Sequence, residues 1–256
     1  MNAKAKDFPK ISIITVVFNS ENSILSTLKS VRNQSYKNIE HIVVDGLSSD
    51  NTCKIVEDFG IEKLISEEDT GIYNAINKGI SVATGDIVGL LHSEDYFESK
   101  NTISKIIQCF KNEEKCNYLY GNLKNFRGNK TIRVWKSKRF NQKDVKLGWM
   151  MPHTTLFCKK EIFESLGTYN EEYQISADYD FILRLVNSDF KPFFFDEFIT
   201  EMSIGGKSTK NLRNLYMKSM EDLKIIKNNL SSNIFVSFII LILKNLRKVH
   251  QFFRNK

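Results

Sequence analysis

The sequence predicts an α/β fold: a mostly parallel central sheet flanked by helices, with a helical extension at the C-terminal end. Continuous apolar runs at residues 11–18, 39–44 and 86–91 have the length and content of buried strands. The segments between them carry polar turns and apolar residues at helical spacing. Strands that alternate with helices in this way favour a parallel sheet.

Each element of the first half is predicted from its own pattern. Strands are expected where apolar and β-branched residues run together, and helices where apolar residues recur three and four positions apart. Polar or flexible residues such as Asn19-Ser20-Glu21 and Gly46 mark the turns between them. In chain order these rules predict a strand at 11–18, a helix at 24–31, a strand at 39–44, a strand at 64–66, a helix at 72–83 and a strand at 86–91.

The net charge of +7 is carried by one end of the chain. Residues 207–256 hold 11 Lys and Arg against 2 Asp and Glu, a balance of +9, which leaves 26 against 28, or −2, for the remainder. A near-neutral body with a basic end suits contact with an anionic surface better than the base-reading groove of a nucleic-acid-binding protein. We therefore expect no nucleic-acid partner.

Several protein classes are disfavoured by what the sequence lacks. The four cysteines show neither zinc spacing nor a compact disulfide framework, which favours reduced thiols in the cytoplasm. We find no secretory signal and no run of the roughly 18 apolar residues that a membrane span needs. Neither GxGxxG nor GxxxxGK[ST] occurs, and no Ser-His-Asp or Cys-His set is evident.

Two adjacent acids follow the strand at 86–91, in the segment His92-Ser93-Glu94-Asp95-Tyr96. Ligands of open α/β folds bind at the carboxyl ends of the strands, and carboxylate oxygens suit Mg²⁺ or Mn²⁺ shared with a substrate phosphate. The same acids could also be solvated turn residues or the cap of the next helix. The pattern alone leaves both interpretations open.

Several motifs in a fixed order make the chain resemble family 2 glycosyltransferases with the GT-A fold. They are IITVVFN, IVVDGLSSDNT, DTGIYNAINKGISVATGD and LLHSEDYF in the first half, then MPHTTLFCKKEIFESLGTYNEEYQISADYDFILRL and IGGKST. The resemblance covers about residues 9–209 and is nearest to bacterial transferases that build O-antigen and other surface polysaccharides. It implies a catalytic domain at 1–206, with a nucleotide-sugar half at 9–97 and an acceptor half at 98–206. A basic, membrane-associating extension at 207–256 would follow.

The resemblance also implies a set of donor contacts. The matching positions are Thr15, Val17, Asn19 and Glu21 for base and ribose, Asp45 for the uracil N–H, Asn77 and Lys78 for the diphosphate, Ser93 and Glu94 for the ribose, and Glu94 and Asp95 for the metal. An ionised carboxylate suits the uracil contact because it only accepts hydrogen bonds. Asp45 could also be an Asx-turn residue, and Lys78 a solvated helix end.

The general base is implied in the second half. Family members usually carry Glu-Asp where this chain has Ala177-Asp178, so Asp178 keeps the carboxylate that takes the proton of the acceptor hydroxyl, with inversion at the sugar carbon. Asp178 could instead cap the helix that follows, and Asp180 is a lesser candidate. His92 also stands where the family has an acid. It could contact ribose or metal, or be a packed neutral histidine.

Residues near the acceptor are defined less sharply. Basic and aromatic residues alternate at 121–151, a segment that includes Trp149, and could stack on sugar rings or attract a lipid-linked diphosphate. Single-stranded nucleic acid and a solvated pair of strands are the other interpretations of that segment. His153 stands at a family position near the acceptor, and Lys207 lies in the segment IGGKST, which resembles a family loop that can close over the diphosphate.

Residues 234–243 (IFVSFIILIL) are nearly all apolar and are followed by cations. The segment is too short to cross a bilayer and is typical of an interfacial helix whose cations meet anionic headgroups. It could also pack on the body of the protein or in a homodimer seam. We expect a protein that is peripheral to the cytoplasmic face of the inner membrane. Deletion of residues 231–256 should then spare transfer to soluble acceptors.

The sequence thus predicts an inverting transferase, dependent on Mn²⁺ or Mg²⁺, that uses a UDP-sugar. It would move a hexose or N-acetylhexosamine to an undecaprenyl-diphosphate-linked oligosaccharide in O-antigen or capsule biosynthesis. The alternative is a nucleotide-sugar-binding or scaffold protein of the same fold that has lost catalysis, since Ala177 and His92 replace acids. Release of UDP from a UDP-sugar distinguishes the two.

Overall fold

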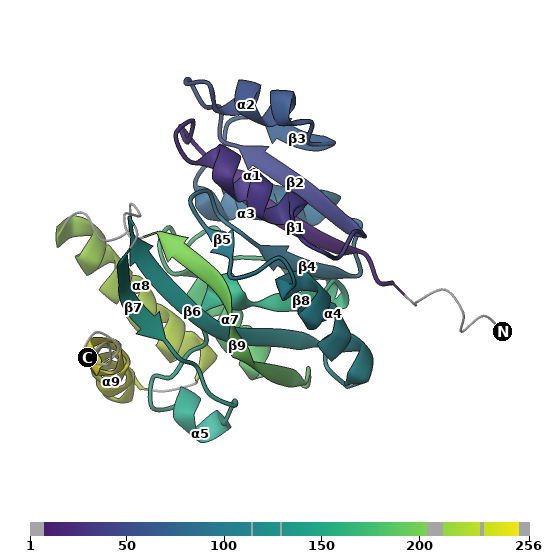
Figure 1. Ribbon diagram of the computed structural model, residues 1–256. Helices are drawn as coiled ribbons and strands as arrows, with labels where there is room; N and C mark the ends of the chain where they lie inside the picture. The colour runs from purple at the N-terminus through teal and green to yellow at the C-terminus, as the bar shows by residue number, and fades with distance from the viewer. Residues whose placement is uncertain (1–7, 114, 129, 204–211, 231–232, 251–256) are drawn as a thin grey trace.

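The computed structural model describes residues 8–113, 115–128, 130–203, 212–230 and 233–250 of the 256-residue chain. One sheet of nine strands runs through the described residues in the order β3-β2-β1-β4-β8-β6-β9-β5, with β7 paired to β6. Figure 1 shows this sheet passing from β2 and β3 at the top to β6 and β9 below, with helices along it. The predicted α/β fold with a central sheet and C-terminal helices is confirmed.

The first half is a parallel αβ unit, as the alternation of strands and helices predicts. β1 pairs with β2 on one side and β4 on the other, and β2 pairs with β3, all in parallel. Its elements are β1 (Ile11–Val17), α1 (Ile24–Arg32), β2 (Ile39–Asp45), α2 (Thr52–Phe59), β3 (Lys63–Ser66), α3 (Ile72–Val82) and β4 (Ile87–Leu90).

The second half continues the same sheet with mixed strand directions. β8 runs antiparallel to β4 and to β6, while β6 and β9 are parallel. Its elements are β5 (Tyr96–Phe97), α4 (Thr102–Asn112), β6 (Tyr118–Arg127), β7 (Lys130–Trp135), α5 (Gln142–Val145), the 3₁₀ turn η1 (His153–Thr155), β8 (Phe157–Lys159), α6 (Glu161–Leu166), α7 (Ala177–Val186) and β9 (Pro192–Ser203). The predicted parallel order therefore holds for the first half, and antiparallel pairs join the second half to it.

Apolar residues on both faces of the strands hold the layers together. Successive residues of a strand point to opposite faces, so Ile14 and Val16 pack with residues of α3 and α7, whereas Ile13 packs with residues of α4. The two halves meet where β4 pairs with β8. A Cβ built on Gly89 of β4 would lie 2.3 Å from the ring of Phe157 in β8, so only glycine fits this junction.

Two helices, α8 (Leu212–Asn229) and α9 (Ile234–His250), follow the sheet and lie beside the second half (Figure 1). Ile225 and Ile226 of α8, together with Ile240 and Leu241 of α9, belong to the same apolar cluster as the buried residues of α7. Of the alternatives weighed for the C-terminal segment, packing on the body therefore describes one face of α9. Among the described residues, no helix combines the length and hydropathy that crossing a membrane requires.

Candidate functional site

The loops at the carboxyl ends of β1, β2 and β4 contain every non-glycine residue with positive φ in the described chain. These are Asn19 (φ 47°), Leu47 (φ 62°) and Glu94 (φ 76°). Residues other than glycine adopt this left-handed backbone conformation at a cost in free energy, and residues in this conformation concentrate at functional sites. The strained backbone therefore marks the same edge of the sheet that the strand order marks as a ligand site.

Asn19 and Glu21, two of the predicted donor contacts, lie at this edge and join the first loop to the second. The Asn19 side-chain oxygen accepts the backbone N–H of Ser49 at 2.9 Å. Glu21 accepts both the backbone N–H and the side-chain amide of Asn51, at 3.0 and 2.9 Å. The two residues shape the edge, and contact with a nucleotide remains a prediction for them.

Thr15 and Val17 do not present side chains to this edge. Thr15 is fully buried in β1, and its hydroxyl lies 2.9 Å from Nε2 of His41 in the neighbouring strand. Val17 is 4% exposed and packs between the sheet and α1. The predicted contacts of these two residues with base and ribose do not fit the burial of their side chains, because β1 is buried along its whole length.

Asp45 is buried, and its carboxylate already accepts several hydrogen bonds. The donors are the backbone N–H of Ser48 at 2.9 Å, the Ser48 hydroxyl, the hydroxyl of Ser66 at 2.8 Å and the thiol of Cys53 at 3.1 Å. Burial alone raises the pKa of Asp45, but these hydrogen bonds outweigh it and lower the pKa below its ordinary value. Asp45 thus organises the β2–α2 loop, as the Asx-turn interpretation proposed, and a uracil N–H would compete with these donors.

Asn77 and Lys78, predicted to approach the diphosphate, are engaged elsewhere. The Asn77 amide donates to the carbonyl of Tyr169 and to Glu171, both at 2.8 Å, and accepts the Tyr169 N–H at 3.0 Å. The Lys78 ammonium lies 2.9 Å from the Glu67 carboxylate and donates a hydrogen bond to the backbone carbonyl of Glu68. Both residues fasten α3 to its neighbours, which does not fit a direct diphosphate contact.

The acidic loop, residues 92–95, follows β4 and is anchored by α1 and by the segment that leads into α1. Ser93 accepts a hydrogen bond from the Ser20 hydroxyl at 3.3 Å, and the backbone N–H of Glu94 donates to Thr27 at 3.1 Å. The side chain of Glu94 is exposed, whereas Asp95 is 3% exposed and its Oδ2 has no hydrogen-bond partner within the described part of the chain. Burial raises the pKa of Asp95 well above its ordinary value, and the nearby charge of Glu94 raises it further.

Asp178 lies at the start of α7, in contact with two side chains from distant parts of the sequence. Its carboxylate is 3.3 Å from Nδ1 of His153 and accepts a hydrogen bond from the Tyr73 hydroxyl at 3.1 Å. Burial alone raises the pKa of Asp178, but the basic side chains of His153, Lys218 and Lys244 outweigh it, so the pKa of Asp178 lies below its ordinary value. The carboxylate is therefore ionised at neutral pH and able to accept a proton.

His92 connects the acidic loop with Asp178. Its ring centroid lies 5.8 Å from that of His153, which contacts Asp178. Burial and the neighbouring His153 lower the pKa of His92 to about 3, so His92 is neutral, and its buried Nδ1 has no hydrogen-bond partner among the described residues. The structure thus brings the loop of Ser93, Glu94 and Asp95 next to the carboxylate of α7, across the two halves of the chain.

Of three further predicted residues, two lie away from this cluster and one lies outside the described residues. Trp149 is 8% exposed and packs against the rings of Tyr120 and Phe140, so it belongs to the core and offers no platform for a sugar. Asp180 is buried in an ion pair with Arg184 at 2.8 Å and accepts from Asn229 at 3.0 Å. These partners give Asp180 a structural role, and Lys207 lies outside the described residues.

Sequence reasoning missed Tyr73 and Asp69 at this site. Tyr73 bridges the carbonyl of Ile175 and the carboxylate of Asp178, although its place in the segment GIYN gave no sign of either partner. The carboxylate of Asp69 reaches the backbone of Gly46, where a Cβ would lie 2.3 Å from Oδ2. A glycine directly after the strand-end acid was the one available signal for this close approach.

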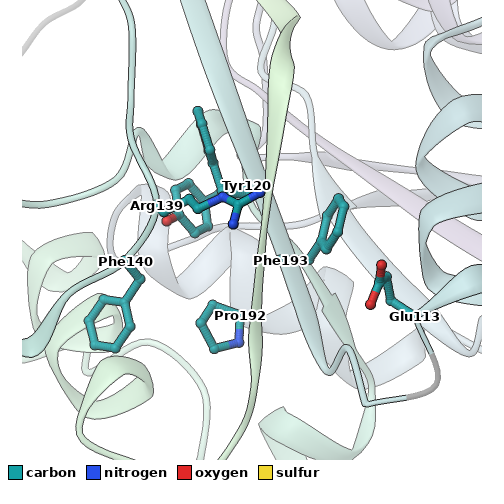
Figure 2. A pocket seen from close by; sticks show the side chains of 7 residues that line it. Glu113, Tyr120, Arg139, Phe140, Pro192 and Phe193 are labelled. Carbon is teal, nitrogen blue, oxygen red and sulfur yellow. The ribbon is translucent and has the colours of Figure 1, made fainter.

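A cavity of about 360 Å³ lies apart from the predicted site residues, none of which lines it. Figure 2 shows Tyr120, Phe140, Pro192 and Phe193 around it, with Arg139 and Glu113 at its sides. It lies by the first residues of β9, whereas β5, directly after the acidic loop, pairs with the last residues of β9. The cavity is therefore not the site that contains Asp178.

The acidic loop fits a divalent cation that is shared with a substrate. In the described residues, no three His, Cys, Asp or Glu side chains gather closely enough to bind a metal without other ligands. Mg²⁺ and similar cations are commonly bound by one or two carboxylates, with substrate phosphates supplying further oxygens. Oδ2 of Asp95, which has no hydrogen-bond partner among the described residues and lies beside the exposed Glu94, is a suitable protein ligand of this kind.

The sequence profile described as "Glycosyl transferase family 2" matches residues 12–167, more than half of the chain. The chain belongs to this family. The matched range includes the acidic loop, Tyr73 and His153, and the fold is the GT-A fold that the sequence motifs imply. The protein is a glycosyltransferase, as predicted.

Relatives and solved structures agree with this assignment. The glycosyltransferase is 32% identical over 183 residues to an uncharacterized glycosyltransferase of Mycobacterium tuberculosis, covering 69% of this chain and 68% of the relative. It is 29% identical over 185 residues to a PGL/p-HBAD biosynthesis glycosyltransferase of Mycobacterium bovis, covering 69% of each.

Among solved structures, TarS 1–349 of S. aureus in complex with UDP-GlcNAc has a TM-score of 0.68 at 18% identity. The match covers 96% of this chain and 74% of that chain. The mannosyltransferase PcManGT of Pyrobaculum calidifontis, in complex with GDP-Man and Mn²⁺, has a TM-score of 0.66 at 13% identity, covering 97% and 76%. A longer TarS structure is covered over 43% of its length. At these identities the likeness concerns the fold.

Proposed function

We propose that this glycosyltransferase is an inverting enzyme that transfers a hexose or N-acetylhexosamine from a UDP-sugar to a lipid-linked oligosaccharide. One observation carries the proposal. The Asp178 carboxylate of the second half contacts His153, and the His153 ring lies next to that of His92 in the acidic loop of the first half. A proton acceptor and a pair of carboxylates therefore border one region, as single displacement at a sugar carbon requires.

The proposed roles follow from the chemistry of the side chains. Asp178, ionised and fixed by Tyr73 and His153, takes the proton of the acceptor hydroxyl as that oxygen attacks the sugar carbon. Glu94 and Asp95 face the departing diphosphate and would hold Mn²⁺ or Mg²⁺ there. A bound cation supplies stabilisation of the negative charge that develops on the leaving UDP. His92, neutral at physiological pH, borders the sugar without adding charge.

The donor proposal is tested by UDP release from a panel of UDP-hexoses and UDP-N-acetylhexosamines, with GDP-mannose as the control. A UDP-linked donor is proposed because the family motifs of this chain match transferases of that class, and TarS in complex with UDP-GlcNAc has the same fold. We expect release from at least one UDP-sugar and none from GDP-mannose. Turnover of GDP-mannose alone would contradict the proposal of a UDP-sugar donor. No release of nucleotide from any donor would favour the alternative of a binding or scaffold protein.

We further propose that the acceptor is presented at a membrane surface that α9 contacts. The outward face of α9 is a stripe of exposed apolar residues, namely Phe235 (72%), Phe238 (53%), Ile239 (43%), Ile242 (44%) and Leu246 (60%). The surrounding segment 207–256 carries a charge of +9. An apolar stripe in a basic segment suits an anionic lipid surface. An undecaprenyl-diphosphate-linked glycan of O-antigen or capsule synthesis, at the cytoplasmic face of the inner membrane, is the acceptor this arrangement favours.

Vesicle binding tests the membrane contact. Phe238→Asp, on the stripe, should weaken sedimentation with phosphatidylglycerol vesicles by about tenfold or more, because a phenyl ring leaves the lipid and an anion enters. Leu25→Asp is the matched control, since Leu25 is 41% exposed on α1 in the first half. Equal binding by both variants would contradict the proposal. A wild-type dimer in light scattering that only Phe238→Asp dissociates would assign the stripe to a second copy of the chain.

A further inference from the structure

The segment directly before Asp178 is held by a carboxylate from α8. The backbone N–H groups of Gln174, Ile175 and Ser176 all donate to Glu221, at 2.9, 3.0 and 2.9 Å. Ser176 precedes α7 but makes no side-chain cap bond to that helix. Glu221 accepts the N–H of the N-cap residue Ser176, as the acid of a capping box does, and also the two N–H groups that precede it.

A buried chain of charges extends this support from α8 to α9. The Lys218 ammonium donates to the Ser176 hydroxyl at 3.1 Å and lies 3.5 Å from the carboxylate of Asp222. Asp222 pairs with Lys244 of α9 at 2.8 Å, and their side chains are 2% and 1% exposed. The Lys244 ammonium also lies 3.1 Å from the ring centroid of Tyr179, the residue after Asp178.

The other side of the same segment is held by the first half of the chain. The Tyr73 hydroxyl donates to the carbonyl of Ile175 and contacts Asp178. The segment before Asp178 is therefore hydrogen-bonded both to α3 and to α8. The position of the Asp178 carboxylate is thus set by contacts that lie 45 to 105 positions away in the sequence. A side chain that is fixed in this way loses little further freedom when a substrate binds, which is how positioning contributes to rate.

We propose that Glu221 is a positioning residue for Asp178, and that α8 and α9 form part of the catalytic unit. The proposal rests on the proposed function, in which Asp178 is the general base. It also revises the expectation that residues 231–256 can be removed without loss of transfer to soluble acceptors. Removing them takes away Lys244 and leaves the buried carboxylate of Asp222 without its nearest cation.

Steady-state kinetics of three α8 variants test the proposal, with the UDP-sugar that the wild type turns over as substrate. Glu221→Ala should lower kcat about 100-fold, the effect expected when a catalytic group moves by roughly 1 Å. The KM for donor and the Kd for UDP, measured by calorimetry, should stay within about twofold, since the predicted nucleotide edge lies on β1, β2 and β4. Glu221→Gln keeps a side-chain oxygen that accepts N–H groups and should restore most of kcat.

Lys224→Ala is the matched control, because Lys224 is exposed on the same helix and, among the described residues, contacts Glu172 in a 3.6 Å surface pair and the ring of Tyr173. It should keep the wild-type kcat. Wild-type kcat in Glu221→Ala overturns the inference, and so does a parallel loss of kcat and UDP binding. If Glu221→Ala fails to fold, Glu221→Asp takes its place. Its carboxylate is one methylene shorter and no longer reaches the three N–H groups, so kcat should fall at unchanged UDP affinity, and a wild-type kcat would overturn the inference. An inactive wild type would instead contradict the proposed function.

Discussion

Lys244 offers the sharpest test of how α9 is joined to the rest of the enzyme. Replacing it with Met keeps the length of the side chain but removes the cation that pairs with Asp222 at 2.8 Å. Both side chains are almost fully buried, and removing one partner of such a pair typically destabilises a protein by about 3–5 kcal/mol. Lys218, 3.5 Å from Asp222 with a quarter of its side chain exposed, retains part of the attraction. We therefore expect a loss near the lower end, about 3 kcal/mol.

Urea unfolding followed by circular dichroism measures this loss, with midpoints compared at a common m-value. Adding Asp222→Asn to Lys244→Met should recover part of the stability, because the double variant also removes the buried negative charge that has lost its nearest cation. Arg247→Met is the control on the same helix. Its side chain is 40% exposed, so it should cost about 1 kcal/mol or less. A change of less than about 0.5 kcal/mol for Lys244→Met would refute the docking of α9.

Two further predictions concern pH and metal. Burial and the charge of Arg32 lower the pKa of His41 to about 3, from about 6.5 in the unfolded chain. Only the unfolded state gains this proton as the pH falls from about 6.5 towards 3, so the contribution of His41 to stability is complete above that window and declines within it. His41→Gln should reduce the loss of unfolding free energy between pH 7 and 5 by about 1–2 kcal/mol, and an unchanged pH dependence would contradict the buried, neutral imidazole. Chelation of divalent ions should stop UDP release, Mn²⁺ or Mg²⁺ should restore it, and Asp95→Asn should raise the half-saturating Mn²⁺ concentration at least about tenfold. UDP release that is unchanged by chelators would contradict the proposed role of the metal.

The fold could be predicted because its signals are local. The apolar runs of β1, β2 and β4 and the helical spacing in α1 and α3 lie within single elements. The place of the acidic loop after a strand and that of Asp178 at the start of a helix could also be predicted, because ordered motifs surround both. In each case the information needed lies within a few residues of the feature.

The assignments that did not fit concern side chains whose partners lie far away. The sequence around Asn77 does not indicate that its amide forms a hydrogen bond with Tyr169, 92 positions later. The sequence around Glu221 likewise does not indicate its hydrogen bonds to the segment before Asp178. Trp149 follows basic residues that suggested a surface, yet it packs in the core against Tyr120. Side-chain direction and long-range partners depend on the assembled packing, which no local pattern encodes.

Asp178 and the acidic loop are proposed to serve the same bound donor, and one variant tests this most directly. Asp178→Asn keeps the shape of the side chain but removes its basicity, so transfer to acceptor should fall by about 10²–10⁴-fold. The Kd for UDP with Mn²⁺ should remain that of the wild type, because Asp178 belongs to the acceptor side of the donor sugar. Transfer at the wild-type rate by Asp178→Asn, with UDP bound normally, would contradict the account.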